Sequence, residues 1–219
     1  MPEISAIVAD LADEQAELDS IVRDLAADAW DAATPAEGWS IRDQISHLAF
    51  FDEQARLAVE DADAFGTGLR AAAADVEAFM NGPLDKGRNM AVGDVLAWWR
   101  AARDAEVSAF RVMDVAARIP WFGPAMSPAS FVSARIMETW AHGQDVIDAL
   151  GIVRIPTDRL KHICHLGVRA RPNSYAARGR AVPPGEIAVH WKAPMDASGR
   201  GTKMQRNSCP ATRSISVLS

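Results

Sequence analysis

Apolar residues recur every three or four positions along four long stretches of the chain, which is the spacing of amphipathic α-helices. The first predicted helix covers residues 4–30, the second 41–61 and the third 92–117. The fourth begins at Pro128 and ends at Gly151. Four long helices joined by irregular links are typical of a four-helix bundle, so the sequence predicts a mainly α fold.

Residues with strong preferences for helix ends support two of these boundaries. Ser40 is a natural N-cap for the second helix, and Asp43 adds a carboxylate to its first turn. Ser127 is the corresponding cap of the fourth helix. Pro128 follows it at the first helical position, where a missing N–H group costs nothing.

Two further helices are predicted from weaker signals. Residues 62–80 are predicted to form a shorter helical segment, with its helix after a Gly-Thr-Gly turn at 66–68. Asn-Gly-Pro at 81–83 is predicted to end it. Thr157 is expected to cap a fifth long helix that extends to about Val168.

The C-terminal part differs in character from the helical part. Apolar and polar residues alternate within 185–192, which predicts one strand and the start of a small appended α/β unit. Beyond it, the sequence becomes polar, basic and unpatterned. We therefore divide the chain into a helical bundle (1–151), the start of the appended unit (152–194) and an atypical tail (195–219).

A shifted reading frame offers a specific explanation of this tail. With GC-rich codons, another frame of the same DNA can encode a strand, a turn and the start of an amphipathic helix. We predict that residues 195–219 are out of frame relative to the ancestral gene. The appended unit would then be truncated and the tail disordered. Codons that cannot yield the alternative peptide would refute this prediction.

Charge and cysteine content narrow the function classes. The net charge is −6 and no basic stripe is present, which argues against a nucleic-acid partner. Two cysteines without a CxxC pair fit a reducing compartment. The N-terminal residues lack a signal-peptide pattern, and no run of about 18 apolar residues occurs. We therefore expect a cytoplasmic protein that does not enter a membrane.

One pair of residues on the predicted fourth helix has metal-binding spacing. Glu138 and His142 are four residues apart, so their side chains project from the same helix face. His47 lies in an apolar stretch of the second helix and would complete a set of two nitrogens and one oxygen. Three protein ligands with an open fourth position are typical of catalytic zinc sites. The alternative is that these are hydrogen-bonded core residues that hold no metal.

The sequences around these residues resemble a known family. GWSIRDQISHL at 38–48 looks like the first signature of the DinB-like superfamily, and RIMETWAHGQD at 135–145 is similar to its helix-four motif. More specifically, the chain resembles the mycothiol-dependent maleylpyruvate isomerase-like proteins over roughly residues 5–192. The resemblance implies a DinB-like four-helix bundle with a divalent metal, usually zinc, at the same three residues. It also implies, for some members, a low-molecular-weight thiol such as mycothiol as cosubstrate.

The function implied by this resemblance is that of a thiol-dependent isomerase or transferase acting on a small molecule. A metal with an open position could favour the thiolate of a bound thiol at neutral pH. The alternative is a non-catalytic module that binds a metal or a small ligand. Two histidines and a carboxylate suit zinc, while nickel, iron and manganese stay open. Whether the protein is an enzyme, and whether it forms a homodimer, is also left open.

Several neighbouring residues could complete the site. Arg135 and Asp145 lie one turn either side of the Glu138/His142 pair, where each could hydrogen-bond to a metal ligand and orient it, or form a surface ion pair. Trp39, Trp121 and Trp140 could line its mouth.

A second candidate group is His162, Cys164 and His165 on the predicted fifth helix. The two histidines could share a face, but Cys164 would not point with both of them.

Overall fold

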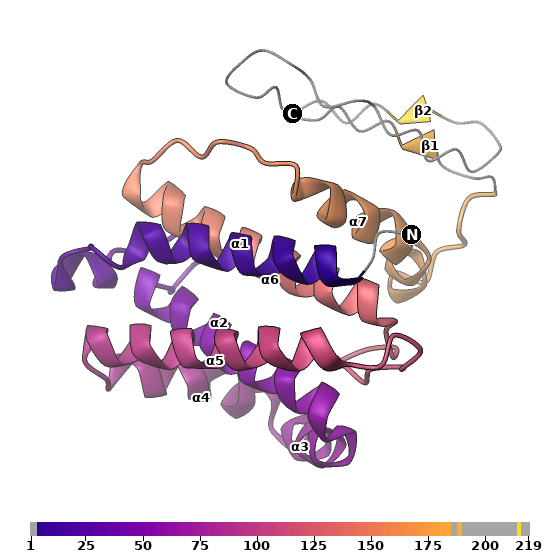
Figure 1. The fold of residues 1–219 in the computed structure, drawn as a ribbon, viewed down its shortest axis with the longest axis horizontal. Coiled ribbons are helices and arrows are strands. Elements are labelled where there is room, and N and C mark those ends of the chain that lie inside the picture. Colours follow the sequence, from indigo (N-terminus) through magenta and orange to yellow (C-terminus); the bar gives the residue numbers. More distant parts are fainter. Residues whose placement is uncertain (1–3, 185–187, 190–213, 216–219) are drawn as a thin grey trace. The chain divides into compact units, whose positions relative to one another are not determined.

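The computed structural model describes residues 4–184, 188–189 and 214–215 (Figure 1). The chain divides into two compact units, Met1–Arg154 and Ile155–Ser219. No helix in the described ranges is both long enough and apolar enough to cross a membrane.

Four long helices form the core of the first unit. They are α1 (Ile4–Val22), α2 (Ile41–Glu60), α5 (Val92–Val112) and α6 (Pro128–Leu150). Helix α2 packs against α5 and α6, and α1 packs against the same two helices, which closes a ring of four (Figure 1). The predicted mainly α four-helix bundle is therefore confirmed.

Large apolar side chains fill the space between these helices. Leu18, Ile45 and Trp99 are at most 1% exposed and belong to one continuous core cluster. Burial of such side chains is the main favourable contribution to the stability of a bundle.

A buried polar network joins all four helices. Arg135 of α6 donates to Asp52 of α2 at 2.7 Å and to Glu106 of α5 at 3.1 Å. The amide of Gln15 on α1 donates to the other Glu106 oxygen at 2.9 Å. Burial and the nearby charge of Asp52 raise the pKa of Glu106 well above its ordinary value, although Arg135 opposes the shift. Each of the four helices therefore contributes one residue to this network.

Helix α1 is shorter than the sequence pattern predicts. It ends at Val22, and a 3-10 helix, η1 (Ala27–Asp31), follows. The apolar spacing continues past Val22 because Trp30 of η1 packs in the same core, where it is 1% exposed. Helix α5 likewise ends at Val112 and not at residue 117.

The segment between α2 and α5 contains two helices, where one was predicted. Helix α3 (Ala62–Ala74) and helix α4 (Val76–Arg88) meet at Asp75, whose side chain accepts from the Ala78 N–H and caps α4. The predicted turn at 66–68 and the predicted stop at 81–83 are wrong, because both lie inside helices. Packing of α4 against α2 compensates for the hydrogen bond that Pro83 cannot donate.

Helix α6 has the ends that the sequence predicts. The Ser127 hydroxyl accepts from the Ser130 N–H, and Pro128 is the first helical residue. Gly151 ends the helix in the left-handed conformation with φ 64°, which glycine adopts without steric cost.

In the second unit, helix α7 spans Leu160–Ala177. It begins after Thr157 and extends beyond Val168, so the predicted cap and end are both wrong. Strand β1 (Ala188–Val189) pairs in parallel with strand β2 (Ser214–Ile215). The rest of the predicted strand at 185–192 lies outside the described residues. The predictions about residues 195–219 also lie outside them, apart from the two residues of β2.

Candidate metal centre

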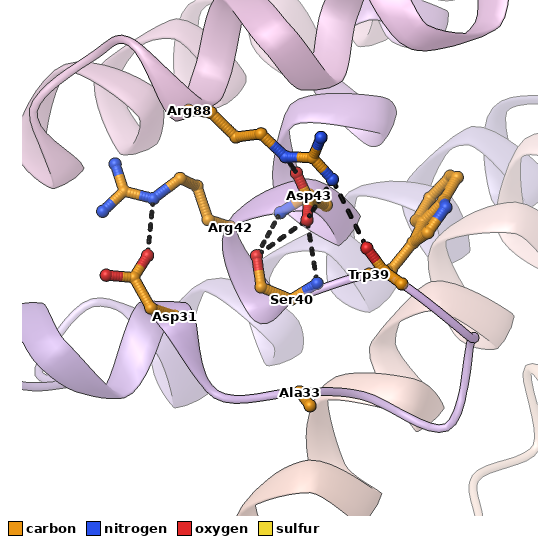
Figure 2. Close-up of a pocket in the computed structure, with 8 residues that line it drawn as sticks. Asp31, Ala33, Trp39, Ser40, Arg42, Asp43 and Arg88 are labelled. Carbon is orange, nitrogen blue, oxygen red and sulfur yellow. Dashed lines mark hydrogen bonds and ion pairs between the residues drawn. The ribbon is translucent and has the colours of Figure 1, made fainter.

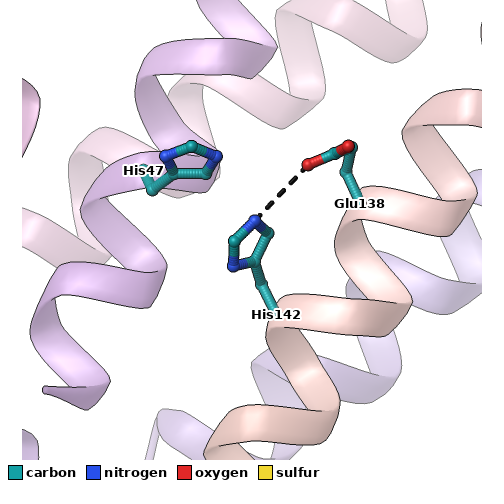
Figure 3. Close-up of side chains that lie close together, drawn as sticks. All are labelled: His47, Glu138 and His142. Atoms are coloured by element: carbon teal, nitrogen blue, oxygen red, sulfur yellow. Dashed lines mark ion pairs between the residues drawn. The ribbon is translucent and has the colours of Figure 1, made fainter. Parts of the chain in front are cut away.

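Three side chains converge between α2 and α6. His47 comes from α2, while Glu138 and His142 lie one turn apart on α6 (Figure 3). One ligand atom from each residue lies within 4.8 Å of the other two. In the part of the chain that the structure describes, no other group of three histidine, cysteine or acidic residues has this geometry. Tertiary packing thus brings together the three residues that the sequence singles out.

His47 is held in its neutral form by its surroundings. Its side chain is 7% exposed, and burial, assisted by the nearby His142, lowers its pKa from 6.5 to about 3. Its ring packs against Phe51 at 4.4 Å and against Trp39 at 5.1 Å between centroids. The buried Nδ1 has no hydrogen-bond partner. A neutral imidazole is the form that binds a metal.

Glu138 supplies the negative charge of the cluster. Burial alone would raise its pKa, but the interaction with His142 and the positive charge of Arg135 outweigh burial and lower it. Glu138 Oε2 lies 3.4 Å from His142 Nε2. The cluster therefore combines an ionised carboxylate with two imidazoles.

Gln44 is a residue of this site that our sequence analysis missed. It is fully buried on α2, and its Oε1 lies 2.5 Å from His142 Nδ1. Its amide nitrogen donates to Thr34 and to Asp145. The available signal was its position three residues before His47, which places both side chains near the same face of α2.

Asp145 lies beside the converging residues, whereas Arg135 lies in the buried network of the bundle. Asp145 contacts Gln44, which in turn contacts His142. Arg135 is 2% exposed and belongs to the buried network of the bundle, so the surface ion-pair alternative does not describe it. Arg135 affects Glu138 through its charge.

Aromatic rings pack against both histidines of the cluster. The Trp39 indole stacks on the His142 ring at 5.9 Å with an interplanar angle of 9°. Phe51, which packs against the His47 ring, also contacts Trp121 and Phe122. Trp121 therefore reaches the cluster through Phe51, while the Trp140 ring packs under the guanidinium of Arg154.

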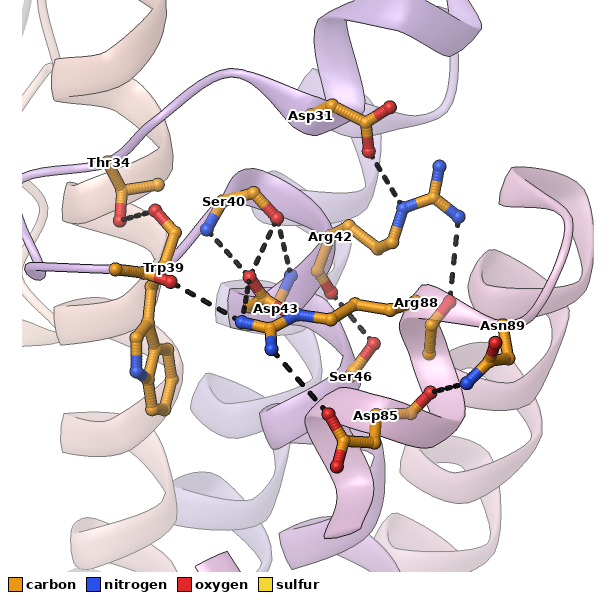
Figure 4. A network of polar contacts seen from close by, with 12 residues as sticks. Asp31, Thr34, Trp39, Ser40, Arg42, Asp43, Ser46, Asp85, Arg88 and Asn89 are labelled. Atoms are coloured by element: carbon orange, nitrogen blue, oxygen red, sulfur yellow. Dashed lines mark hydrogen bonds and ion pairs between the residues drawn. The ribbon is translucent and has the colours of Figure 1, made fainter. Parts of the chain in front are cut away.

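The start of α2 is fixed by several polar contacts (Figure 4). The Asp43 side chain accepts from the Ser40 N–H at 2.9 Å, and the Ser40 hydroxyl accepts from the Asp43 N–H at 3.3 Å. Arg88 of α4 adds a two-armed ion pair with Asp43 at 2.8 and 3.1 Å. These contacts fix the position from which α2 presents Gln44 and His47.

A surface pocket of about 500 Å³ lies beside this helix start (Figure 2). Trp39, Arg42 and Arg88 are among its lining residues. Arg42 pairs with Asp31 at 3.0 Å and Arg88 pairs with Asp43, so both cations are already neutralised by acids of the pocket. The pocket does not contain any of the three converging residues.

The second candidate group does not converge. His162, Cys164 and His165 lie on α7, and they do not form a metal-binding arrangement among the described residues. Burial raises the pKa of the Cys164 thiol, which disfavours the thiolate that binds metals.

Comparisons with known proteins agree with this architecture. Residues 11–147, which include the whole converging cluster, match the family model of the mycothiol maleylpyruvate isomerase N-terminal domain. The chain is 39% identical over 194 residues to uncharacterized protein Rv0036c of Mycobacterium tuberculosis strain H37Rv. The same figures hold for uncharacterized protein MT0041 of strain CDC 1551 / Oshkosh. Each alignment covers 89% of this chain and 76% of the relative.

A solved structure shares the fold. The crystal structure of the mycothiol-dependent maleylpyruvate isomerase superposes with a TM-score of 0.59, covering 94% of this chain and 82% of that one. A mutant of that enzyme gives the same values. The sequence identity is 11%, so this likeness shows the fold alone. Because the family model matches more than half of the chain, the protein belongs to the family of the mycothiol maleylpyruvate isomerase N-terminal domain.

Proposed function

We propose that the protein binds one divalent metal ion, with zinc as the preferred metal, through His47, Glu138 and His142. The observation that carries this proposal is the convergence of two imidazoles and one carboxylate within 4.8 Å. Two histidines and one acidic residue form a donor set that zinc uses in catalytic sites.

The chemistry of the donors fits a cation. His47 is neutral and buried, and its Nδ1 has no hydrogen-bond partner, which is costly for a polar atom inside a protein. Glu138 is ionised and about one third of its side chain is exposed, so the cluster is reachable from solvent. A divalent cation would bond the imidazoles and neutralise the carboxylate at the same time.

We further propose that the protein is a thiol-dependent isomerase or transferase acting on a small molecule. A divalent metal bound here would act as a Lewis acid and favour the thiolate form of a thiol such as mycothiol. The chain would contribute the charge of Glu138, the stacked ring of Trp39 and the apolar wall at Phe51. These rings pack against the two imidazoles and so limit the access of water to them. Membership of the family supports this reading, because its model describes a mycothiol-dependent isomerase domain.

The alternative is a module that binds a metal or small ligand without catalysis. A thiol that changes the absorption spectrum of cobalt-substituted protein would favour the enzyme, since the thiol must then reach the metal. A spectrum that is unchanged by thiols and by substrate analogues would favour the module. Cytoplasmic location and the lack of a nucleic-acid partner stay predictions.

Elemental analysis of protein purified without an affinity tag tests the metal site directly. We expect about one equivalent of metal in the wild type and little in His142→Ala, because the cluster loses one of its three ligands. His165→Ala removes an exposed histidine of α7 and is the matched control, which should retain the metal. Wild-type protein that stays metal-free after incubation with zinc would refute the proposal.

A further inference from the structure

Gln44 hydrogen-bonds to His142 of the proposed metal centre and is itself held by two further hydrogen bonds. Its buried amide contacts His142 through the oxygen, and Thr34 and Asp145 through the nitrogen. We propose that Gln44 is a positioning residue that holds neutral His142 in the tautomer protonated at Nδ1, with the free lone pair on Nε2. The inference rests on the proposed function for the role of Nε2 as a ligand. The tautomer itself is a property of the metal-free chain.

The first constraint on the Gln44 amide comes from a backbone carbonyl. The Trp39 carbonyl oxygen has no proton, so it accepts from the Thr34 hydroxyl at 3.0 Å. That hydroxyl has a single proton, which is used in this bond, and towards Gln44 it can only accept. The Gln44 atom that lies 2.9 Å from Thr34 Oγ1 is therefore the amide nitrogen.

Asp145 gives a second and independent constraint. Its Oδ2 lies 3.1 Å from the same Gln44 nitrogen, and a carboxylate oxygen accepts hydrogen bonds. The two amide protons thus have one acceptor each. Both constraints place the nitrogen on the Thr34/Asp145 side and leave the oxygen facing His142.

The tautomer of His142 follows from this orientation. Gln44 Oε1 carries no proton, so His142 Nδ1, 2.5 Å away, must donate. A neutral imidazole has one N–H proton, and with that proton on Nδ1 the other nitrogen, Nε2, is bare. Nε2 is the atom that lies 3.4 Å from Glu138 Oε2. In the neutral ring a lone pair and a carboxylate oxygen then face each other, an arrangement that either a metal ion or a second ring proton between them would stabilise. The hydrogen bond from His142 that lowers the pKa of Glu138 is that of the ring with this second proton on Nε2.

His47 provides an internal contrast. Its Nδ1 is buried but has no hydrogen-bond partner, so no hydrogen bond at Nδ1 fixes its tautomer. Of the two histidines, only His142 has its Nδ1 held by a glutamine side chain. In metal proteins, loss of the partner that orients a histidine ligand typically weakens metal binding by about 10–100-fold.

NMR of the metal-free wild type tests the tautomer without any variant of Gln44. Long-range ¹H–¹⁵N spectra distinguish the two tautomers by the shifts of the ring nitrogens, at a pH about two units above the ordinary histidine pKa. Comparison with His142→Ala assigns the signals. We expect the Nδ1–H form for His142. A predominant Nε2–H form, or equal amounts of both, would overturn the inference.

Zinc affinity of two glutamine variants tests the positioning role. Gln44→Leu should bind zinc about 10–100-fold more weakly and lose the preference for Nδ1–H, because the acceptor is gone. Gln15→Leu is the matched control, since it also removes a buried glutamine amide and its hydrogen bond, here to Glu106. It should keep the wild-type affinity and tautomer. Equal zinc affinity in Gln44→Leu and wild type would refute the role.

A conservative variant separates positioning from packing. Gln44→Glu retains an oxygen that can accept from His142 Nδ1, so we expect it to keep the proton on Nδ1. It also replaces the amide nitrogen by an oxygen that faces the acceptors Thr34 and Asp145, so we expect it to be less stable than the wild type, and the tautomer is read in the folded variant. Loss of that tautomer in Gln44→Glu would contradict the role of the acceptor. The outcomes also separate this inference from the metal proposal. Nδ1–H in a protein that binds no metal would refute only the metal site, whereas Nε2–H in a protein that binds metal would refute only the inference.

Discussion

Arg135 Nη2 lies 2.7 Å from Asp52 Oδ1, and the two side chains are only 2% and 1% exposed. The pair joins α6 to α2, the same two helices that supply the proposed metal ligands. Arg135 also donates to Glu106 of α5, whose other oxygen accepts from Gln15 of α1. The Arg135–Asp52 pair therefore helps apolar packing to hold together the two helices of the proposed metal centre, while the Glu106 and Gln15 contacts attach α5 and α1.

Replacement of Arg135 by methionine should destabilise the protein strongly. It leaves two buried carboxylates without their cation, and breaking a buried ion pair from one side costs about 3–5 kcal/mol. Arg100→Met is the control, because Arg100 pairs with Asp19 while 42% of its own side chain is exposed. Exposed pairs contribute about 1 kcal/mol or less. Equal unfolding free energies of the two variants in urea would contradict the structural role of Arg135.

Stability should depend on pH through Glu106. Burial raises the pKa of Glu106 in the folded state, so above pH 4.5 the folded protein binds more protons at this site than the unfolded chain. Stability therefore falls as pH rises from 4.5 towards the raised pKa, by up to about 1.4 kcal/mol per pH unit.

Glu106→Gln should reduce this pH dependence, since glutamine does not titrate. Glu37→Gln, which changes an exposed acid, is the control and should keep the wild-type slope. Urea unfolding of metal-free protein at several pH values measures the effect. Identical slopes in wild type and Glu106→Gln would show that Glu106 does not titrate between the two states.

Gly87→Ala should loosen the contact between α4 and α2. A Cβ at Gly87 would lie 1.8 Å from Ser46 Oγ and 2.7 Å from Ser46 Cβ, so the two helices would have to separate. Overpacking of this kind costs about 1–3 kcal/mol. Gly68→Ala in α3 meets no atom within 4 Å and should stabilise by about 0.5–1 kcal/mol, as in other helices. Thermal or urea unfolding distinguishes the two variants, and equal stability would contradict the close approach.

The sequence alone predicted those features that depend on residues near one another in the chain. The N-cap at Ser40, with the Asp43 carboxylate in the first turn, and the ends of α6 at Pro128 and Gly151 follow from local backbone preferences. The four-residue spacing of Glu138 and His142 places them on one helix face before any tertiary structure is known.

Local signals failed where tertiary packing outweighs them. Gly66, Gly68 and Pro83 are typical of turns, yet all three lie inside helices. Helix α4 forms around Pro83 because its face packs against α2, with Leu84 only 3% exposed. Propensity contributes about 1–3 kcal/mol at such positions, which the packing of a whole helix can offset.

Only the tertiary structure decided which distant side chains meet. Periodicity does not say that Gln44 contacts His142, or that Arg135 lies inside the bundle and contacts Asp52. Those contacts depend on how α2 and α6 are rotated and shifted against each other. Rotation and shift are set by close packing of the whole core, to which residues from all four helices contribute at once.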